Sequence, residues 1–340
     1  MMKKKIFSTI CAIILFITTL LGVRIRPPLS VYASEQKTPY NVALEIIDWK
    51  KSDVGSTSDG YLINDTFLTQ AGTTPGDWYP IGLGRLGIKD NQDGYLAVIN
   101  DNVQKRYQTS AKLDKSKATE WHRISLAVLA SGGNPRRMGE NGEIDLIADG
   151  TYNRVDGKGN GILGKQGING FIWGLIAIDS MQYEVPENAY YSRDDMILNI
   201  LNRQLADGGW ALTGNISDPD MTSMAIQALA PYYNSEKEYI YENKKLQADG
   251  SKITKKVRTV VDEAISWLSL AQNTDGGYSS WGTENCESAV QVAVALCTLG
   301  IDIFTDIRFI KDGNTIYDAI LSYQNADGGF LHSLQYDPEN

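Results

Sequence analysis

Five tryptophans recur through this 340-residue chain at places where their rings could serve a ligand site. Trp78, Trp121, Trp173, Trp210 and Trp281 each fall at or near the same end of successive helical segments. If the fold gathers these ends, the π faces of the rings could stabilise a carbocation or receive a flat apolar ligand. The competing interpretation is structural, because aromatic residues at helical spacing commonly form a core.

The segment 218–222 brings two carboxylates to the start of an apolar helix. Asp218 or Ser217 can cap that helix, and Asp220 lies at the favourable, positive end of its dipole. A similar set of acids and cap residues occurs at 284–288, which is typical of a repeated structural device. Further polar side chains near helix starts could contact a ligand: His122, Thr222 and Glu287, with Asp77, Glu120, Arg123 and Asn169 beside them.

The histidines and cysteines are too few and too scattered for a usual zinc site. His122 and His332 are the two histidines, and neither is beside a cysteine, so a His/Cys cluster cannot be assembled. The segment 156–161 has a faint likeness to a calcium loop, but Lys158 occupies a ligand position and Gly167 replaces the bidentate glutamate of an EF-hand. We therefore predict no metal and no cofactor.

The motif Gln-x-x-Asp-Gly-Gly-aromatic occurs three times, at 204–210, 272–278 and 324–330. Each copy separates two apolar segments with helical periodicity. The Asp-Gly-Gly residues tolerate positive φ, so the chain can leave one helix there and reverse its direction. The sequence therefore predicts helical hairpins, each made of a polar-faced outer helix followed by a buried one.

The same alternation continues upstream in degenerate form and predicts an all-α fold. Buried helices are expected at 78–87, 118–131, 170–180, 221–232 and 287–299. Outer helices are expected at 40–50, 95–107, 144–147, 193–205, 257–272 and 315–324. About six hairpins result, forming one domain over 34–340, and the last hairpin lacks its inner helix. A last outer helix without that partner is expected to leave an apolar face open.

On these turns the chain resembles the prenyltransferase and squalene-cyclase repeat superfamily, whose α/α toroid is a double ring of helices around a central cavity. The resemblance is strong over 190–340 and rests on hairpin rhythm alone over 40–190. The chain is also similar to the helical domain of transcobalamin-like carriers, which share the toroid without catalysis. Fold resemblance does not select among these functions.

Segment 218–222 in turn resembles the Asp-x-Asp-Asp-Thr motif of squalene-hopene-type, class II terpene cyclases. The resemblance implies that Asp220 is the acid that protonates an alkene, with Asp218 beside it in the motif. Met221 replaces the last aspartate of that motif. Since such an acid must be kept neutral and poised by its neighbours, the substitution removes part of what the reaction needs.

The first 33 residues are typical of a secretory signal peptide. Lys3, Lys4 and Lys5 precede an apolar run at 6–23, and cleavage is expected after Ala33. An uncleaved membrane anchor is the alternative, because a run of 18 residues is near the lower limit for a span. We expect a secreted or cell-surface protein that touches a membrane only through an uncleaved leader.

Cleavage leaves two cysteines, Cys286 and Cys297, on one predicted helix. Eleven residues of helix separate them by roughly 16 Å, whereas a disulfide needs Cα atoms within about 7 Å. They cannot pair with each other, and we expect both to be small buried residues.

The charge balance excludes some partners. The chain has a net charge of −9, and the leader carries five basic and no acidic residues, so the mature chain is more acidic still. This argues against nucleic acid and against adhesion to anionic membranes by charge alone.

The first expectation is an exported module that binds a small apolar or flat ligand, isoprenoid or corrinoid-like, or a surface partner. A class II cyclase, which is an isomerase, and a structural or polysaccharide-associated cell-surface module are the alternatives.

Overall fold

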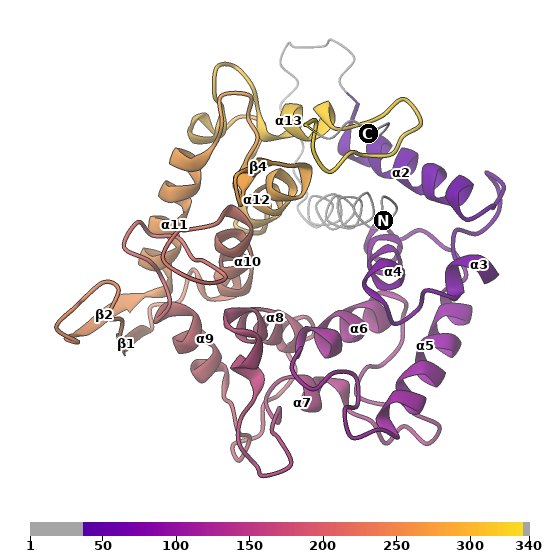
Figure 1. The fold of residues 1–340 in the computed structure, drawn as a ribbon, viewed down its shortest axis with the longest axis horizontal. Helices are drawn as coiled ribbons and strands as arrows, with labels where there is room; N and C mark the ends of the chain where they lie inside the picture. The colour runs from indigo at the N-terminus through magenta and orange to yellow at the C-terminus, as the bar shows by residue number, and fades with distance from the viewer. Residues whose placement is uncertain (1–36, 336–340) are drawn as a thin grey trace.

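The computed structural model describes residues 37–335, and within them the chain is predominantly helical (Figure 1). The prediction of a mainly α-helical protein is confirmed at that level. The proposed signal peptide at 1–33 lies outside the described residues. Within 37–335, no helix combines the length and the apolar character that a bilayer span requires.

Two sets of helices alternate along the chain. Figure 1 shows one set facing the middle of the molecule, and we call these the inner helices: α4 (Thr74–Leu86), α6 (Thr119–Ala130), α8 (Ile168–Asp179), α10 (Pro219–Leu229) and α12 (Cys286–Thr298). The outer helices lie around them: α2 (Pro39–Asp53), α5 (Gln92–Tyr107), α7 (Leu146–Gly150), α9 (Arg193–Leu201), α11 (Val257–Ala271) and α13 (Ile316–Ser322). Each inner helix packs against the next one along the chain.

Most predicted helices agree with the observed ones to within a few residues, and the largest differences have local causes. Helix α4 begins four residues earlier than expected, because the Thr73 hydroxyl caps it and Pro75 fits its first turn. Helix α9 ends four residues earlier, at Leu201, and Gln204 instead belongs to the turn that follows. Short elements that the pattern did not predict are α3 (Asp65–Leu68) and the 3₁₀ helices Leu163–Gln166 and Ile307–Phe309. The helix predicted at 221–232 ends as a 3₁₀ turn, Ala230–Tyr232.

The polar insertion after α10 contains a β-hairpin of strands β1 (Glu238–Glu242) and β2 (Lys252–Lys256). Tyr239 and Tyr241 are buried on one face of β1, whereas Ile240 between them is exposed. A smaller antiparallel pair, β3 (Ser279–Ser280) and β4 (Thr283–Glu284), precedes α12. The helical pattern of the sequence predicts neither hairpin.

The three Asp-Gly-Gly turns have the same internal hydrogen bonds. In each, the aspartate carboxylate accepts the N–H of the second glycine at 2.8 to 3.1 Å. In each, the residue after the glutamine donates its N–H to the carbonyl of that glycine at 2.8 to 3.0 Å. The first glycine, at 208, 276 or 328, has φ between +88° and +95°. The motif therefore specifies one compact turn geometry.

Each of these turns also packs against an outer helix or the residue that caps it. A Cβ on Gly208 would lie 2.7 Å from the Glu263 carbonyl oxygen of α11, and one on Gly276 would lie 2.3 Å from the carbonyl oxygen of Thr315, the cap of α13. The glycines therefore allow the backbones to approach closely.

The third turn makes this contact with the first outer helix. A Cβ on Gly328 would lie 3.0 Å from the Glu45 carbonyl oxygen of α2. The Trp49 indole donates to Asp327 at 3.1 Å, and the Gln324 amide donates to Glu45 at 2.8 Å. The beginning and the end of the described chain therefore lie side by side, as α2 and α13 do in Figure 1.

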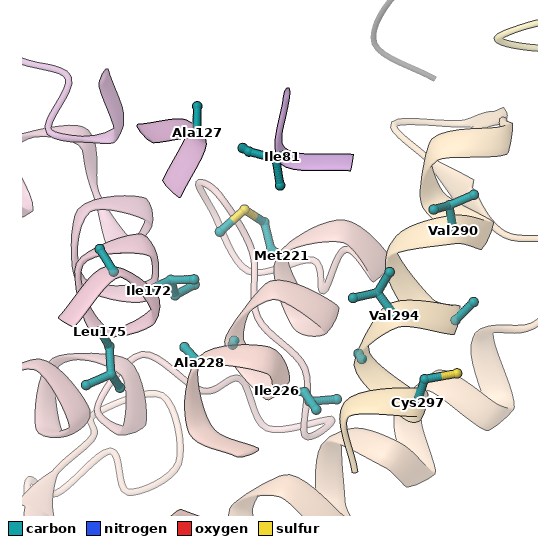
Figure 2. Close-up of a cluster of buried hydrophobic side chains, with 14 of the residues drawn as sticks. Ile81, Ala127, Ile172, Leu175, Met221, Ile226, Ala228, Val290, Val294 and Cys297 are labelled. Atoms are coloured by element: carbon teal, nitrogen blue, oxygen red, sulfur yellow. The ribbon is translucent and has the colours of Figure 1, made fainter. Parts of the chain in front are cut away.

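The core lies between neighbouring helices. Figure 2 shows part of it: Ile172 and Leu175 come from α8, Met221, Ile226 and Ala228 from α10, and Val290, Val294 and Cys297 from α12. Cys286 and Cys297 are both free and buried, as predicted.

Candidate functional site

The N-terminal ends of α10 and α12 bring together a group of polar side chains that we call the acid cluster: Asp218, Asp220, Ser280, Glu287, Ser288 and His332. Asp218 is the N-cap of α10, and its Oδ1 accepts the Met221 N–H at 3.0 Å. Its other oxygen accepts a hydrogen bond from the Ser280 hydroxyl of β3. Both oxygens of Asp218 are thus engaged, so this residue has the capping role that its position predicts.

Asp220 is in a different situation, although it is only two residues further along. Its Oδ1 is enclosed and has no hydrogen-bond partner among the described residues. Burial raises the pKa of Asp220 to about 7, and the negative charges of Asp218 and Glu287 add to the shift. The hydroxyls of Ser288 and Ser280 act in the opposite direction. Asp220 therefore keeps its proton at pH values well above those at which an ordinary aspartate ionises.

Glu287 stands at the start of α12 as Asp220 does at the start of α10. Asn285 caps this helix by accepting the Ser288 N–H at 2.9 Å. The Glu287 carboxylate lies 2.8 Å from Nδ1 of His332, and the Cys286 N–H donates to the His332 carbonyl at 3.1 Å. The segment after the third turn is therefore attached to the N-terminal end of α12 by a side-chain and a backbone contact.

The shifted Asp220 makes the stability of the protein depend on pH. Below about pH 4 the carboxyl is protonated in both the folded and the unfolded chain, and the folded state carries no penalty. Between pH 4 and pH 7 the unfolded chain ionises first, so stability is lost progressively, and above about pH 7 the loss is complete. We expect Asp220→Asn to raise the free energy of unfolding at pH 8 by about 2 kcal/mol and to change it little at pH 4.

Urea denaturation between pH 4 and pH 8 measures this difference. Asp48→Asn on α2 is the control, because Asp48 is exposed and its substitution should alter stability by less than about 0.5 kcal/mol at either pH. An equal effect of Asp220→Asn at both ends of the range would show that the carboxyl ionises normally in the folded protein.

Trp78 and Trp173 come together although they belong to non-adjacent helices. Trp78 lies in the first part of α4 and Trp173 in α8, and α6 packs between these two helices. The ring centroids are 5.7 Å apart with an interplanar angle of 66°, which is an edge-to-face contact. Both residues are partly exposed. The two rings therefore meet although α6 lies between the helices that carry them.

Trp121 and Trp210 do not join this pair. Both are fully buried. The Trp121 indole donates to the Tyr107 hydroxyl at 2.7 Å, and the Trp210 indole donates to the Ile200 carbonyl at 2.8 Å. Each ring packs between an inner and an outer helix, so the structural interpretation holds for these two residues.

Two of the polar ligand-binding candidates are also core residues. His122 is buried with Nε2 2.7 Å from the Gly150 carbonyl oxygen, and burial lowers its pKa to about 4. It is therefore neutral at pH 7. The Thr222 hydroxyl is buried and accepts the Trp210 N–H at 2.9 Å, so it fixes the turn rather than facing a ligand.

Trp281 is exposed over 77% of its surface, at the tip of the β3–β4 hairpin. It takes no part in the packing between helices and shares a surface pocket with Asp218.

The sequence did not point to three members of the acid cluster as site residues: Ser280, Ser288 and His332. The Ser-Ser-Trp-Gly-Thr-Glu segment around Trp281 has the two-residue hairpin spacing that could have revealed Ser280.

A second polar group lies at the starts of α4 and α6 and is structural. Asp77 is fully buried, and its carboxylate accepts from Arg123 Nε at 2.8 Å, from the Tyr95 hydroxyl at 2.8 Å and from the Gly72 N–H at 2.7 Å. Glu120 holds the outer side of the Arg123 guanidinium at 2.6 and 3.0 Å. These groups form hydrogen bonds with one another and leave few donors or acceptors for a ligand.

The described part of the chain contains no cluster of three or more His, Cys, Asp or Glu side chains that could hold a metal ion. The loop at 156–161 is closed by its own contacts, since the Asp156 carboxylate accepts the N–H groups of Lys158 and Asn160, each at 2.9 Å.

No protein-family model matches the sequence, and the search of curated proteins finds no match. What bears on the function is therefore the chemistry of the two places described above, the paired tryptophans and the acid cluster.

Proposed function

We propose that this chain is an exported α/α toroid of the prenyltransferase and squalene-cyclase repeat type. In this proposal the toroid binds a small flat or apolar ligand, isoprenoid or corrinoid-like, inside the ring of inner helices. Two kinds of observation support it: the arrangement of the helices, and the aromatic pair of Trp78 and Trp173.

The arrangement of the helices supports a ring. Successive inner helices pack on one another from α4 to α12, and outer helices lie around them (Figure 1). The third turn packs on α2 through glycine, as the earlier turns pack on α11 and on the cap of α13. In a ring of hairpins, each turn should pack on the next outer helix and the last turn on the first outer helix. The glycine contacts of the three turns follow this order.

The Trp78–Trp173 pair is the observation that carries the binding proposal. Two partly exposed indoles meet across α6 rather than being buried in hairpin cores. Aromatic faces of this kind bind flat apolar ligands by stacking and by excluding water. The acidic character of the mature chain favours a neutral or cationic ligand over an anionic one.

Native mass spectrometry of the protein purified from its host tests the proposal, because a tightly bound ligand is retained. We expect a lipid or a corrinoid to co-purify, and Trp78→Ala and Trp173→Ala to weaken its binding by about tenfold or more, as the loss of an aromatic anchor does elsewhere. Tyr61→Ala is the control, since Tyr61 is 59% exposed at another place. Full retention of the ligand in both tryptophan variants would contradict this site.

A class II terpene cyclase is the second candidate, and Asp220 is the specific observation that favours it. An alkene is protonated only by an acid that is itself protonated, and the pKa of Asp220, about 7, leaves much of this group neutral at physiological pH. Met221 in place of the motif's last aspartate counts against it. Cyclisation of squalene by the mature protein, lost in Asp220→Asn, would favour the enzyme over the binding module.

A structural cell-surface module is the remaining alternative. It predicts an empty interior and no turnover, so the two experiments above separate it from both other functions.

A further inference from the structure

A pocket of about 420 Å³ lies on the surface beside the N-terminal end of α10. One wall is the segment 211–219, and the other is the β3–β4 hairpin with Ser279, Trp281 and Gly282. Neither wall belongs to the helices that carry the Trp78–Trp173 pair. The pocket is thus a separate place from the ligand site proposed above.

Trp281 is presented in this pocket at an energetic cost. It has φ +53° and Gly282 has φ +80°, so both residues of the tight turn are left-handed. Asparagine or aspartate followed by glycine usually occupies such a turn, because a bulky residue with a Cβ is strained there. The exposed indole gains almost no burial in return. A strained residue that does not contribute to packing points to a role in binding.

The opposite wall is held in place rather than loose. The Ser217 hydroxyl donates to Asp207 of the first Asp-Gly-Gly turn at 2.6 Å, and Lys245 donates to the Gly214 carbonyl at 2.9 Å. The Asp218 N–H donates to the Trp210 carbonyl at 2.8 Å. The wall nevertheless presents Leu212 and Ile216 with 42% and 86% of their surfaces exposed. The pocket is therefore preformed and partly apolar.

The polar groups of the pocket select among ligands. Among the described residues, the lining contains no basic side chain and one acid, Asp218, which already uses both oxygens within the protein. Hydroxyl and amide groups are what remains, including the exposed Thr213 and Asn215. The matching ligand is neutral, rich in hydroxyl groups and flat and apolar on one face. A pyranose ring has this combination, since its C–H face can stack on an indole while its hydroxyls bind amides and hydroxyls.

We propose that this pocket, which we call the Trp281 pocket, binds a sugar unit of a neutral polysaccharide. Trp281 stacks on the apolar face of the sugar ring, and the 211–217 wall contacts its edge. A lipid surface fits the pocket less well, because insertion into it would take short hydroxyl and amide side chains out of water. These side chains are Thr213, Asn215, Ser217 and Ser279.

Titration of the mature protein with chitohexaose and with cellohexaose, monitored by isothermal calorimetry, tests the proposal. We expect one of them to bind, and Trp281→Ala to weaken its binding by at least tenfold. Ile240→Ala is the matched control, because Ile240 is 63% exposed on a strand of the other hairpin, and this variant should bind as the unaltered protein does. Trp78→Ala should also bind sugar normally, which separates this site from the proposed interior site.

Trp281→Asn distinguishes a binding role from a structural one. Asparagine suits the left-handed turn, so this variant should fold with equal or higher thermal stability and still lose sugar binding. Absence of binding by both oligosaccharides would overturn the proposal, as would equal binding by Trp281→Ala. Binding to neutral phosphatidylcholine vesicles through Trp281 instead of to the oligosaccharides would also overturn it.

Discussion

Replacing Asp77 by alanine is expected to lower the free energy of unfolding by about 3 to 5 kcal/mol, because it removes the inner of the two carboxylates that pair with the buried Arg123 guanidinium. Arg123 is 8% exposed in its side chain, and Asp77 is its innermost partner at 2.8 Å. The substitution also leaves the Tyr95 hydroxyl and the Gly72 N–H without their acceptor. Urea denaturation at pH 7 measures the loss.

Asp101→Ala on α5 is the control for this prediction. Asp101 pairs with Lys105 at 2.6 Å, but the two side chains are 61% and 70% exposed. Exposed pairs of this kind contribute less than about 1 kcal/mol. If Asp77→Ala and Asp101→Ala destabilised the protein equally, the Asp77 network would not stabilise the starts of α4 and α6 as described.

Replacing Gly276 by alanine is expected to cost about 3 kcal/mol or more, from two additive causes. Its φ of +88° is unfavourable for any residue with a Cβ. The new Cβ would also lie 2.3 Å from the Thr315 carbonyl oxygen, so the turn or the start of α13 must move. Denaturation of the variant measures the sum.

Gly313→Ala separates the two causes. Gly313 has nearly the same backbone angle, with φ +85°, but a Cβ added there would meet nothing within 4 Å. We expect this control to cost only about 1 kcal/mol, which is the backbone strain alone. Similar losses in the two variants would mean that the turn can move away from Thr315 without penalty, and that its close contact is not a constraint on the fold.

The helices could be predicted because their causes are local. Apolar periodicity, cap residues and the glycines after helix ends all lie within a few residues of the structure they specify. The late start predicted for α4 shows the limit of that reasoning: Pro75 and Gly76 have low intrinsic helix propensity, but Thr73 caps the helix and Pro75 fits its first turn. The β1–β2 hairpin was not predicted. Tyr239, Ile240 and Tyr241 alternate in burial in the structure, but all three are large apolar or aromatic residues and show no alternation in the sequence.

The candidate site was less predictable because its contacts connect distant segments. Asp218 was recognisable as a cap, but its second partner, Ser280, lies 62 residues away. Glu287 and His332 are 45 residues apart. Whether an indole is buried depends on which elements pack over it, so Trp210 and Trp281 looked alike in the sequence but differ completely in exposure.

The contact between α2 and the third turn has a consequence for the order of folding. Trp49 and its partner Asp327 are 278 residues apart, and Tyr317 donates to the Lys37 carbonyl across 280 residues. A chain synthesised from its N-terminus makes α2 first, but that helix must wait for nearly the whole sequence before its last neighbour exists. Contacts of such long sequence separation are slow to form because a large loop must close. The earliest of the described helices to emerge is therefore among the last to be completed.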